Sequence, residues 1–342
     1  MGTIFVCGGA GFIGSNFVRY WLETYPEDKV VNYDLLTYAG NLENLADLAD
    51  DPRYAFAQGD IGDHDRLVEL FARHRPDYVV NFAAESHNSR AVLDPDAFFR
   101  TNVMGLLGLI RAVRDAGVPR FHHVSTCEVY GDLALDTDDV FTETSPYRPR
   151  TPYNASKAAG DHAVSAFVET FGLPATISIA CNNYGPYQFP EKVIPYFCVR
   201  ALQGQRMPLY RSSQNRREWL QVRDHCRGID LVLKKGRIGE TYNLGSGVEL
   251  DVEQIASTIA ETLGLTGEYK EYVPDRPGLD RRYLLDSTKA RAELGWTPQI
   301  PIEQGLPETI RWYRDNEHWW RRLLDRQAVD EAAWTKSPVA TR

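Results

Sequence analysis

Six short apolar runs recur through the first 180 residues, each followed by a longer amphipathic stretch. The runs are TIFVCG, KVVNYD, RYAFAQ, DYVVNFA, RFHHVST and ATISIA. Most are rich in β-branched or aromatic residues, and each has the length of a buried strand. Strands that alternate with helices predict a parallel sheet covered by helices on both faces, an α/β doubly wound fold of the Rossmann type. Ligands of such sheets bind beyond the carboxyl ends of the strands, so the residues after each run are the first candidates for a site.

The second half of the chain has a different texture. After residue 180, loops punctuated by Pro and Gly, such as NNYGPYQFPEKVIP, separate shorter helical and extended stretches. We expect residues 1–180 to form the sheet domain and residues 181–330 a smaller domain that covers the ligand. Segments near 219–246, including WLQVRDHCRGIDLVL and ETYNLGS, are expected to return to the main sheet. A helix is predicted over 301–322, and residues 331–342 have the composition of a weakly ordered tail.

Charge and cysteine usage exclude several classes of protein. The 342 residues carry a formal net charge of −9 with acidic and basic residues interleaved, which argues against a nucleic-acid partner. No apolar run approaches the roughly 18 residues of a membrane span, and the N-terminus lacks the basic start of a secretory signal. Five scattered cysteines without CxxC spacing predict reduced thiols rather than disulfides or a metal site. We therefore expect a cytoplasmic protein that contacts neither membrane nor nucleic acid.

The first run leads directly into a glycine-rich turn. GGAGFIG places Gly8, Gly11 and Gly14 in a GxxGxxG pattern between a predicted strand and a predicted helix. Such glycines allow a tight turn and let backbone N–H groups approach a pyrophosphate at the helix N-terminus. Asp34 lies 20 residues beyond Gly14, at the end of the second run, where a carboxylate can bind a ribose 2′-hydroxyl. Because an acid there would repel a 2′-phosphate, the pattern predicts NAD rather than NADP.

A second motif predicts acid–base chemistry. YNASK places Tyr153 and Lys157 four residues apart, on one face of a predicted helix. A lysine ammonium and a cationic nicotinamide beside the phenol would favour phenolate and lower the pKa of Tyr153 below its usual value of about 10. Thr126 lies 27 residues upstream, at the end of a predicted strand. With the glycine turn, these residues predict a base that removes a hydroxyl proton while hydride leaves the same carbon.

These motifs resemble those of a known family. Over nearly its whole length the chain is similar to extended short-chain dehydrogenases/reductases that modify nucleotide sugars, and it most resembles the dTDP-glucose 4,6-dehydratases. The resemblance is carried by GGAGFIGSNFV, LTYAGNLENL, AAESHNSR, STCEVYGDL, TPYNASKAAGDH, NNYGPYQFPEKVIP, YNLGS and DRPGLDRRY. It implies NAD as cofactor, a nucleotide-diphosphate sugar (UDP- or dTDP-linked) as substrate, and oxidation of sugar C4 by Tyr153 with help from Lys157 and Thr126.

The resemblance also implies binding residues and a homodimer. The implied NAD-binding residues are Gly8, Gly11, Phe12, Ile13, Gly14, Asp34, Asp60, Ile61, Ala83, Ala84, Tyr153, Lys157 and Asn183. The implied nucleotide-sugar residues are Ser86, His87, Arg90, Asn182, Lys192, Arg217, Asn243 and Arg276. The implied dimer uses helices near 94–115 and 152–171, with an apolar surface formed by Leu106, Leu107, Ile110, Val164 and Phe167. The alternative is that these residues pack into the core of a single chain.

The chain departs from the family pattern near the sugar. Where the dehydratases carry Thr-Asp-Glu, this chain has Thr126-Cys127-Glu128, and all three are predicted catalytic residues. In the family the aspartic acid protonates the departing C6 hydroxyl, and the glutamate removes the C5 proton. Ser89 replaces another aspartate, and the segment RSS adds Arg211 as a substrate-binding candidate. Two lost acids and one gained arginine favour a substrate more anionic than glucose.

These departures lead to one main hypothesis and three alternatives. Related nucleotide-sugar decarboxylases carry Thr-Ser-Glu here, and the thiol of Cys127 is neutral like that serine. An Asp carboxylate about 4 Å from a substrate carboxylate would cause a repulsion of about 1–4 kcal/mol, which a thiol avoids. The main hypothesis is decarboxylation of UDP-glucuronate to a UDP-4-keto-pentose or UDP-xylose. Because a thiol can also donate a proton to a leaving hydroxyl, dehydration of a nucleotide glucose by 4,6- or 5,6-elimination is an alternative. The others are C4 epimerisation of a uronate and a non-catalytic NAD-binding role.

Overall fold

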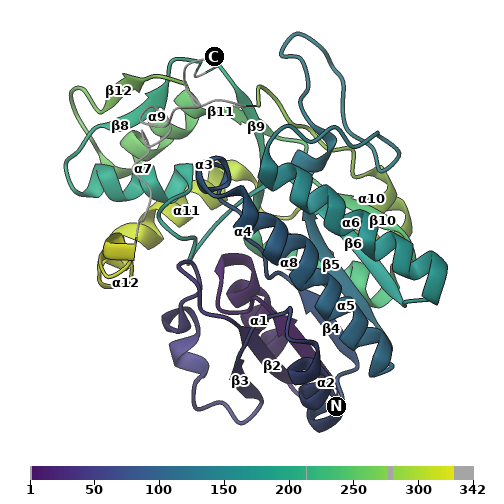
Figure 1. Cartoon of the computed structure of the whole chain (residues 1–342). Helices are drawn as coiled ribbons and strands as arrows, with labels where there is room; N and C mark the ends of the chain where they lie inside the picture. Colours follow the sequence, from purple (N-terminus) through teal and green to yellow (C-terminus); the bar gives the residue numbers. More distant parts are fainter. Residues whose placement is uncertain (1, 213, 276–279, 327–342) are drawn as a thin grey trace.

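A seven-stranded parallel sheet is the centre of the fold (Figure 1). The computed structural model describes residues 2–212, 214–275 and 280–326. The strands pair in the order β10-β6-β5-β4-β1-β2-β3, and each pairing is parallel. Their bounds are β1 Thr3–Cys7, β2 Lys29–Asp34, β3 Tyr54–Gln58, β4 Tyr78–Asn81, β5 Phe121–Thr126, β6 Ala175–Ala180 and β10 Thr241–Leu244. The six predicted strands and the Rossmann-type α/β class are confirmed.

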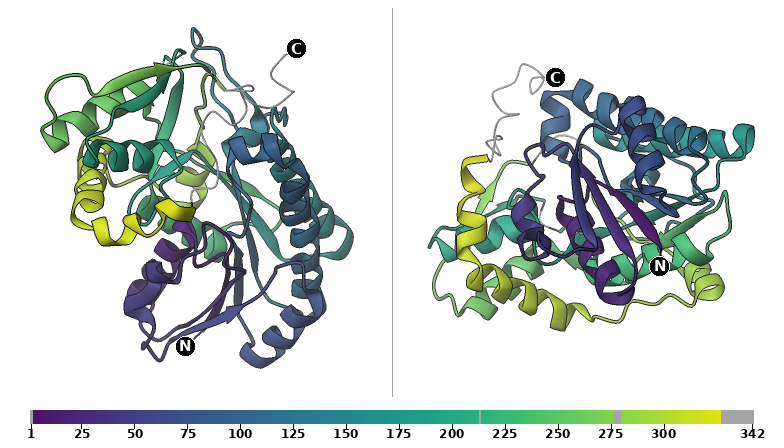
Figure 2. Two further views of the ribbon diagram at one scale, coloured as in Figure 1. Left: turned by 60° about the vertical axis from the view of Figure 1, so that its left-hand side comes forward. Right: turned by 90° about the horizontal axis from the view of Figure 1, so that it is seen from below.

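Helices cover both faces of this sheet (Figure 2). One layer contains α2 (His64–His74), α5 (Leu106–Asp115) and α6 (Pro152–Phe171), and the other contains α1 (Phe12–Thr24), α8 (Val222–Lys235) and α10 (Thr288–Leu294). Shorter helical segments follow the strands or lead into these helices: η1 Leu42–Leu48, α3 Asn88–Leu93, α4 Pro95–Phe99, η2 Arg100–Gly105 and η3 Cys127–Tyr130. Within the described ranges, no helix combines the length and apolar character needed to cross a membrane.

A second group of elements lies beside the carboxyl ends of the central strands (Figure 1). It holds a three-stranded sheet of β11 (Glu249–Asp251), β9 (Arg216–Gln221) and β7 (Asn182–Tyr184), and a pair of β12 (Lys270–Val273) and β8 (Met207–Tyr210). Its helices are α7 Val193–Leu202, α9 Val252–Leu263, α11 Ile302–Asp315, α12 Glu317–Arg321 and η4 Leu324–Arg326.

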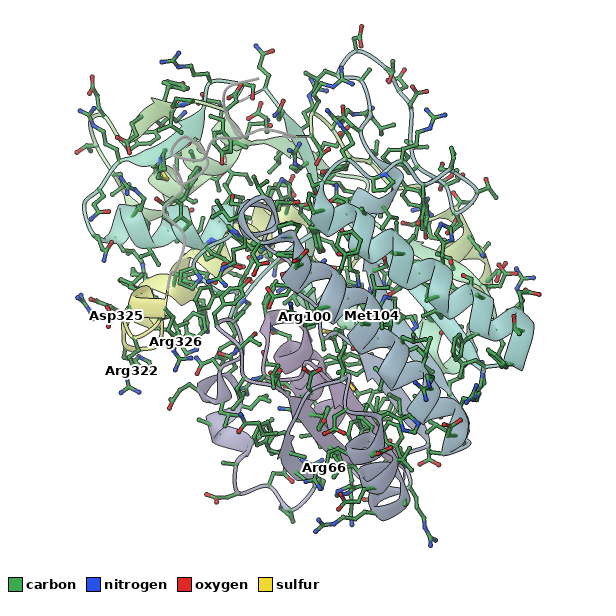
Figure 3. The ribbon with its side chains drawn as sticks, in the orientation of Figure 1. Arg66, Arg100, Met104, Arg322, Asp325 and Arg326 are labelled. Carbon is green, nitrogen blue, oxygen red and sulfur yellow. The ribbon has the colours of Figure 1, made fainter. Side chains whose placement is uncertain are left out.

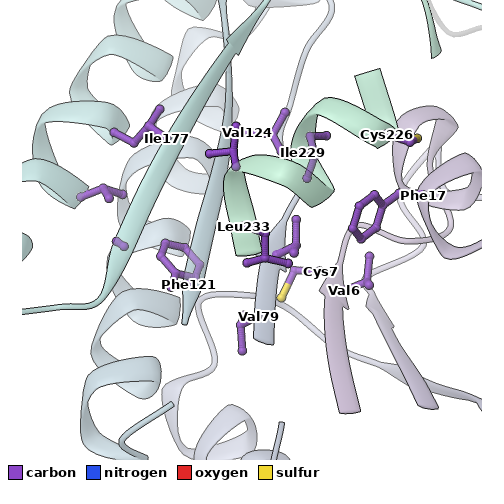
Figure 4. Close-up of a cluster of buried hydrophobic side chains, with 14 of the residues drawn as sticks. Val6, Cys7, Phe17, Val79, Phe121, Val124, Ile177, Cys226, Ile229 and Leu233 are labelled. Carbon is purple, nitrogen blue, oxygen red and sulfur yellow. The ribbon is translucent and has the colours of Figure 1, made fainter. Parts of the chain in front are cut away.

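Two hydrophobic clusters hold these parts together. In the larger one, Val6 and Phe121 of the central sheet are fully buried together with Leu233 of α8 (Figure 4). In the smaller one, Ile259 of α9 is buried with Tyr313 of α11. Burial of apolar surface stabilises such packing by about 25 cal/mol per Å². The larger cluster therefore fixes α8 on the main sheet, although α8 directly follows β9, a strand of the three-stranded sheet.

The second half of the chain differs in detail from the prediction. Residues 241–244 pair with β6 at the edge of the central sheet, whereas 216–221 belong to the three-stranded sheet. The single helix predicted over 301–322 is wrong, because Asn316 (φ −118°, ψ 41°) separates α11 from α12. The division into domains near residue 180 stays a prediction, and residues 331–342 lie outside the described part of the chain.

Most residues predicted for a dimer interface lie inside the chain. Three of the five are at most 1% exposed and belong to the larger cluster: Leu106, Ile110 and Val164. Leu107 and Phe167 pack partly buried against the same cluster. Met104 of η2, by contrast, is 61% exposed on this helical layer, near the exposed Arg100 (Figure 3). Core packing therefore accounts for most of the apolar pattern, and the homodimer stays a prediction.

Candidate active site

Glycines shape the turn between β1 and α1. Gly8 has φ +79°, and a Cβ on it would lie 2.5 Å from the backbone nitrogen of Ala83. A Cβ on Gly14 would lie 2.1 Å from the carbonyl oxygen of Gly8. The first helical residue, Phe12, follows Gly11, which makes no side-chain cap. The first N–H groups of α1 are therefore left for an anion, and this close backbone turn fits the pyrophosphate of a dinucleotide.

Asp34 lies beside this turn, at the end of β2. Its carboxylate accepts the N–H groups of Ala10 at 3.0 Å and Leu36 at 2.8 Å. Burial raises the pKa of Asp34, and the two backbone hydrogen bonds oppose that shift. Each carboxylate oxygen keeps a further lone pair with which it can accept a ribose hydroxyl. Asp60 and Ile61 follow β3, where Ile61 is buried in the larger cluster.

A cavity of about 450 Å³ lies at the carboxyl ends of β1, β4, β5 and β6. Of the predicted site residues, those that line it are Gly8, Gly11, Phe12, Ile13, Gly14, Ala84, Ser86, His87, Thr126, Glu128, Tyr153, Lys157, Asn182, Asn183, Lys192 and Arg217. Among the described residues, predicted site residues outside its lining are Asp34, Asp60, Ile61, Ala83, Arg90, Cys127, Arg211 and Asn243. Arg276 lies outside the described residues. The cavity thus joins the glycine turn to the two predicted bases, Tyr153 and Glu128.

Tyr153 and Lys157 enter the cavity from the first two turns of α6. Both are at least nine-tenths buried. The ammonium of Lys157 donates to the Val124 carbonyl at 2.8 Å and lies 3.3 Å from Nε2 of His123. Burial lowers the pKa of Lys157 to about 8, which Asp161 opposes. Lys157 is thus anchored to β5 beside the tyrosine.

The pKa of Tyr153 is raised by the protein alone, and the lowering predicted with a cationic nicotinamide beside the phenol stays a prediction. Burial raises the pKa of the phenol, the negative charge of Glu128 acts in the same direction, and the Thr126 hydroxyl opposes both. Tyr153 is only 8% exposed, and the Lys157 ammonium is held by a backbone carbonyl. Positive charge from a bound ligand would act against this shift and favour the phenolate.

Thr126, Cys127 and Glu128 lie where β5 passes into η3. The Thr126 hydroxyl accepts the Glu128 N–H at 3.4 Å, and Oε2 of Glu128 accepts Nδ2 of Asn88 at 2.9 Å. Cys127 is only 1% exposed, outside the cavity lining. Burial raises the pKa of its thiol well above the usual range, and Glu128 acts in the same direction. The structure therefore favours a packing role for Cys127 over a thiol that contacts the sugar.

Two predicted cations line the cavity. Arg217, in β9, donates to the carbonyl oxygens of Asp280 and Arg281. The ammonium of Lys192 donates to the Ser86 carbonyl at 2.6 Å. A guanidinium and an ammonium at the cavity can form charge-assisted hydrogen bonds with an anionic diphosphate.

Three other predicted substrate residues lie elsewhere. Asn243 is fully buried in β10, where its amide binds the Tyr130 hydroxyl and a backbone carbonyl. That burial argues against the predicted contact with a diphosphate. The Arg90 guanidinium lies over the ring of Tyr38, 3.4 Å from its centroid. Arg211 is exposed, and its N–H continues the pairing of β8 with β12.

The sequence analysis missed several polar or aromatic cavity residues. Further ones in the cavity wall are Asn88, Gln188, Glu191, Asn215, Trp219, His225, Asp280 and Tyr283. Glu191 belongs to NNYGPYQFPEKVIP, and Asp280 and Tyr283 to DRPGLDRRY. These acidic and phenolic side chains could have been predicted as cavity residues, because they lie inside motifs that carry the family resemblance.

Comparison with known proteins agrees with this geometry. A family model described as GDP-mannose 4,6 dehydratase matches residues 5–309. The chain belongs to this family. The resemblance to nucleotide-sugar short-chain dehydrogenases/reductases is therefore confirmed, over nearly the whole chain.

Similar members of the family include dTDP-glucose 4,6-dehydratases. That of Xanthomonas campestris pv. campestris (strain B100) is 48% identical over 344 residues, 95% of this chain and 97% of its own. The structure of the Streptomyces venezuelae enzyme, solved with NAD bound, is 46% identical with a TM-score of 0.90, covering 94% of this chain and 99% of that one. The Bacillus anthracis enzyme in complex with NAD is 43% identical with a TM-score of 0.88, covering 94% and 100%.

The glycine turn makes a first testable prediction. Gly14→Ala places a methyl group against the Gly8 carbonyl and forces α1 away from β1, so NAD affinity should fall by at least ~10-fold, about 1.4 kcal/mol. Isothermal titration calorimetry with NAD measures this change. Gly117→Ala is the control, since Gly117 has φ +62° and open space around it and lies outside the cavity. Equal NAD affinity in wild type and Gly14→Ala would contradict the assignment of the turn.

Proposed function

We propose that this chain is an NAD-dependent dehydratase of a nucleotide-diphosphate glucose, which oxidises sugar C4 and removes water across C5 and C6. The observation that carries the proposal is that Tyr153, Glu128 and the glycine turn all line one cavity. Relatives 43–48% identical, over at least 94% of this chain, are dTDP-glucose 4,6-dehydratases. They support the dehydratase alternative better than the main hypothesis from the sequence, decarboxylation of UDP-glucuronate.

Tyr153 is the base for the C4 hydroxyl. NAD, when bound, accepts the hydride that leaves C4. Tyr153 takes the hydroxyl proton at its phenolic oxygen, while Thr126 contacts that phenol and Lys157 holds positive charge one helical turn away. Burial makes the phenol hard to ionise, so the charge of Lys157 and of the oxidised cofactor has to offset it.

Glu128 is the base for C5. Once C4 is a ketone, the C5 proton becomes acidic because the negative charge left on C5 spreads onto the C4 oxygen. The Glu128 carboxylate lines the cavity and is held by the amide of Asn88. As the C5–C6 double bond forms, the C6–O bond breaks and water leaves. Addition of hydride at C6, with the proton returned from Glu128 to C5, would give a 4-keto-6-deoxy sugar. Addition of hydride at C4, with the proton returned from Tyr153 to the C4 oxygen, would give a 5,6-ene.

Cationic and amide donors line the cavity and suit a diphosphate. Arg217 supplies a guanidinium, Lys192 an ammonium and Asn182 an amide. Charge-assisted hydrogen bonds of this kind are roughly twice as strong as neutral ones. The same donors serve a UDP- or a dTDP-linked sugar.

The buried position of Cys127 removes the main argument for a uronate substrate. That argument required the thiol to stand beside the substrate carboxylate, where an aspartate would repel it. Because Cys127 is buried and does not line the cavity, its neutral side chain is compatible with an uncharged hexose as well.

Product analysis tests the proposed function. The purified protein is incubated separately with dTDP-glucose, UDP-glucose and UDP-glucuronate, and the products are identified by mass and by NMR. We expect loss of water from at least one of the two glucose nucleotides. Release of CO₂ from UDP-glucuronate, with both glucose nucleotides unchanged, would restore the decarboxylase hypothesis.

Removal of the Tyr153 hydroxyl tests the first step. Tyr153→Phe should still bind NAD and nucleotide sugar but lose at least ~10²-fold in kcat, the usual contribution of a positioned base. Tyr272→Phe, which removes a hydroxyl exposed to solvent, is the matched control. A Tyr153→Phe variant with the turnover of wild type would exclude this base.

Neighbouring arginines in β9 test the diphosphate contact. Arg217→Ala should raise the Kd of dTDP by about 10- to 100-fold, because a charge-assisted hydrogen bond contributes roughly 1.5–3 kcal/mol. Arg216 points to the other face of the strand and is exposed, so Arg216→Ala should leave the Kd near that of wild type. Fluorescence or calorimetric titration compares the two variants. Similar Kd values for both would show that Arg217 is misassigned.

A further inference from the structure

The proposed elimination needs an acid, and the thiol of Cys127, which the sequence offers as a proton donor, does not line the cavity. Hydroxide is a poor leaving group, so the C6 oxygen has to receive a proton as its bond to carbon breaks. Cys127 stands where the family carries its acid, yet it lies outside the cavity lining, and burial raises the pKa of its thiol. A different proton donor has to face the sugar.

Three carboxylic side chains line the cavity in the described part of the chain: Glu128, Glu191 and Asp280. Glu128 is the proposed C5 base, and its Oε2 is bonded to Asn88. Glu191 accepts the Tyr38 hydroxyl at 3.1 Å and lies 4.0 Å from the His87 ring, among groups that follow β2 and β4. Asp280 is the carboxyl group that interacts electrostatically with Glu128.

One carboxyl oxygen of Asp280 accepts a hydrogen bond, and the other has no hydrogen-bond partner. The side chain is 1% exposed, and its Oδ2 accepts the hydroxyl of Tyr283, another cavity residue. Its Oδ1 is buried without a hydrogen-bond partner, and Nη1 of Arg150 lies 3.7 Å from it. A buried oxygen left without a hydrogen bond costs about 1–3 kcal/mol, which a hydroxyl group of a ligand would relieve.

The backbone holds Asp280 rigidly beside η3. Its carbonyl oxygen accepts Arg217, and the following residues pair with β9 through the Arg216–Arg282 bridge. The Arg217 guanidinium also lies over the Tyr283 ring, 4.9 Å from its centroid. The carboxyl group is therefore positioned from two elements, as a group acting on a bound substrate requires.

The surroundings of Asp280 raise its pKa towards neutrality. Burial raises its pKa to about 6, and the charge of Glu128 on η3 raises it in the same direction. The Tyr283 hydroxyl, Arg217 of β9 and Arg150 oppose the shift, and the raising effects win. The negative charge of Glu128 therefore helps Asp280 to hold a proton that it can deliver to a substrate.

We propose that Asp280 is the acid that protonates the departing C6 oxygen. The inference rests on the proposed dehydration. In this step the Glu128 carboxylate takes the C5 proton, and the electron pair of that C–H bond forms the C5–C6 double bond. The C6–O bond breaks, and the oxygen takes the Asp280 proton and leaves as water. Asp280 ends as carboxylate and Glu128 as carboxylic acid, so protons and electrons balance.

The test separates elimination from the steps before it. Asp280→Asn keeps the shape of the side chain and removes the acid. With dTDP-glucose, or whichever glucose nucleotide the wild type dehydrates, release of water should fall by at least ~10²-fold. Exchange of the C5 proton with deuterated solvent, followed by NMR, should continue, because Tyr153 and Glu128 remain. Exposed Asp138→Asn is the matched control.

A substrate with a better leaving group gives the decisive comparison. The 6-deoxy-6-fluoro analogue of the same nucleotide sugar loses fluoride, which needs far less protonation than hydroxide. Asp280→Asn should release fluoride within a few-fold of the wild-type rate, as measured with a fluoride electrode. That result also shows that the variant is folded and binds its substrate.

Each other outcome has a defined meaning. Normal water release by Asp280→Asn overturns the proposal, as does equal loss of water and fluoride release. Loss of water release in Cys127→Ser with normal release in Asp280→Asn assigns the proton to the thiol and also overturns it. If the wild type releases no water from any glucose nucleotide, the proposed function itself fails, independently of Asp280.

Discussion

Close contact between the backbones of β1 and α1 determines where the chemistry of this protein can take place. Gly14 lies so near the Gly8 carbonyl that any side chain would separate helix from strand. A Cβ on Gly8 would in turn lie 2.5 Å from the backbone nitrogen of Ala83, after β4. This packing brings the N-terminus of α1 to the carboxyl edge of the sheet. The same edge carries Thr126 and Glu128 after β5, so the parallel arrangement gathers distant residues at one cavity.

Burial of charge is the second constraint. The cavity contains Tyr153, Lys157 and Asp280, and for each of them desolvation is the largest cause of the pKa shift. Desolvation raises the pKa of the Tyr153 phenol and the pKa of the Asp280 carboxyl group. A site that must first remove a proton at C4 and later deliver one at C6 needs groups with such different tendencies.

The sequence predicted local features well and long-range ones poorly. The six strands, the glycine turn and the Tyr153–Lys157 pair are encoded in short segments whose periodicity or spacing is visible. Cys127 was expected to face the sugar, but the orientation of its side chain depends on how β5 turns into η3. Asp280 approaches Glu128 only because its segment pairs with β9, and no short-range pattern records that contact.

The fate of the C6 oxygen tests the central claim most directly. The protein is incubated with the glucose nucleotide labelled with ¹⁸O at C6, and product and water are analysed by mass spectrometry. The account predicts that the label leaves the sugar and appears in water at the rate of product formation. Turnover to a product that retains the label at C6 would contradict it.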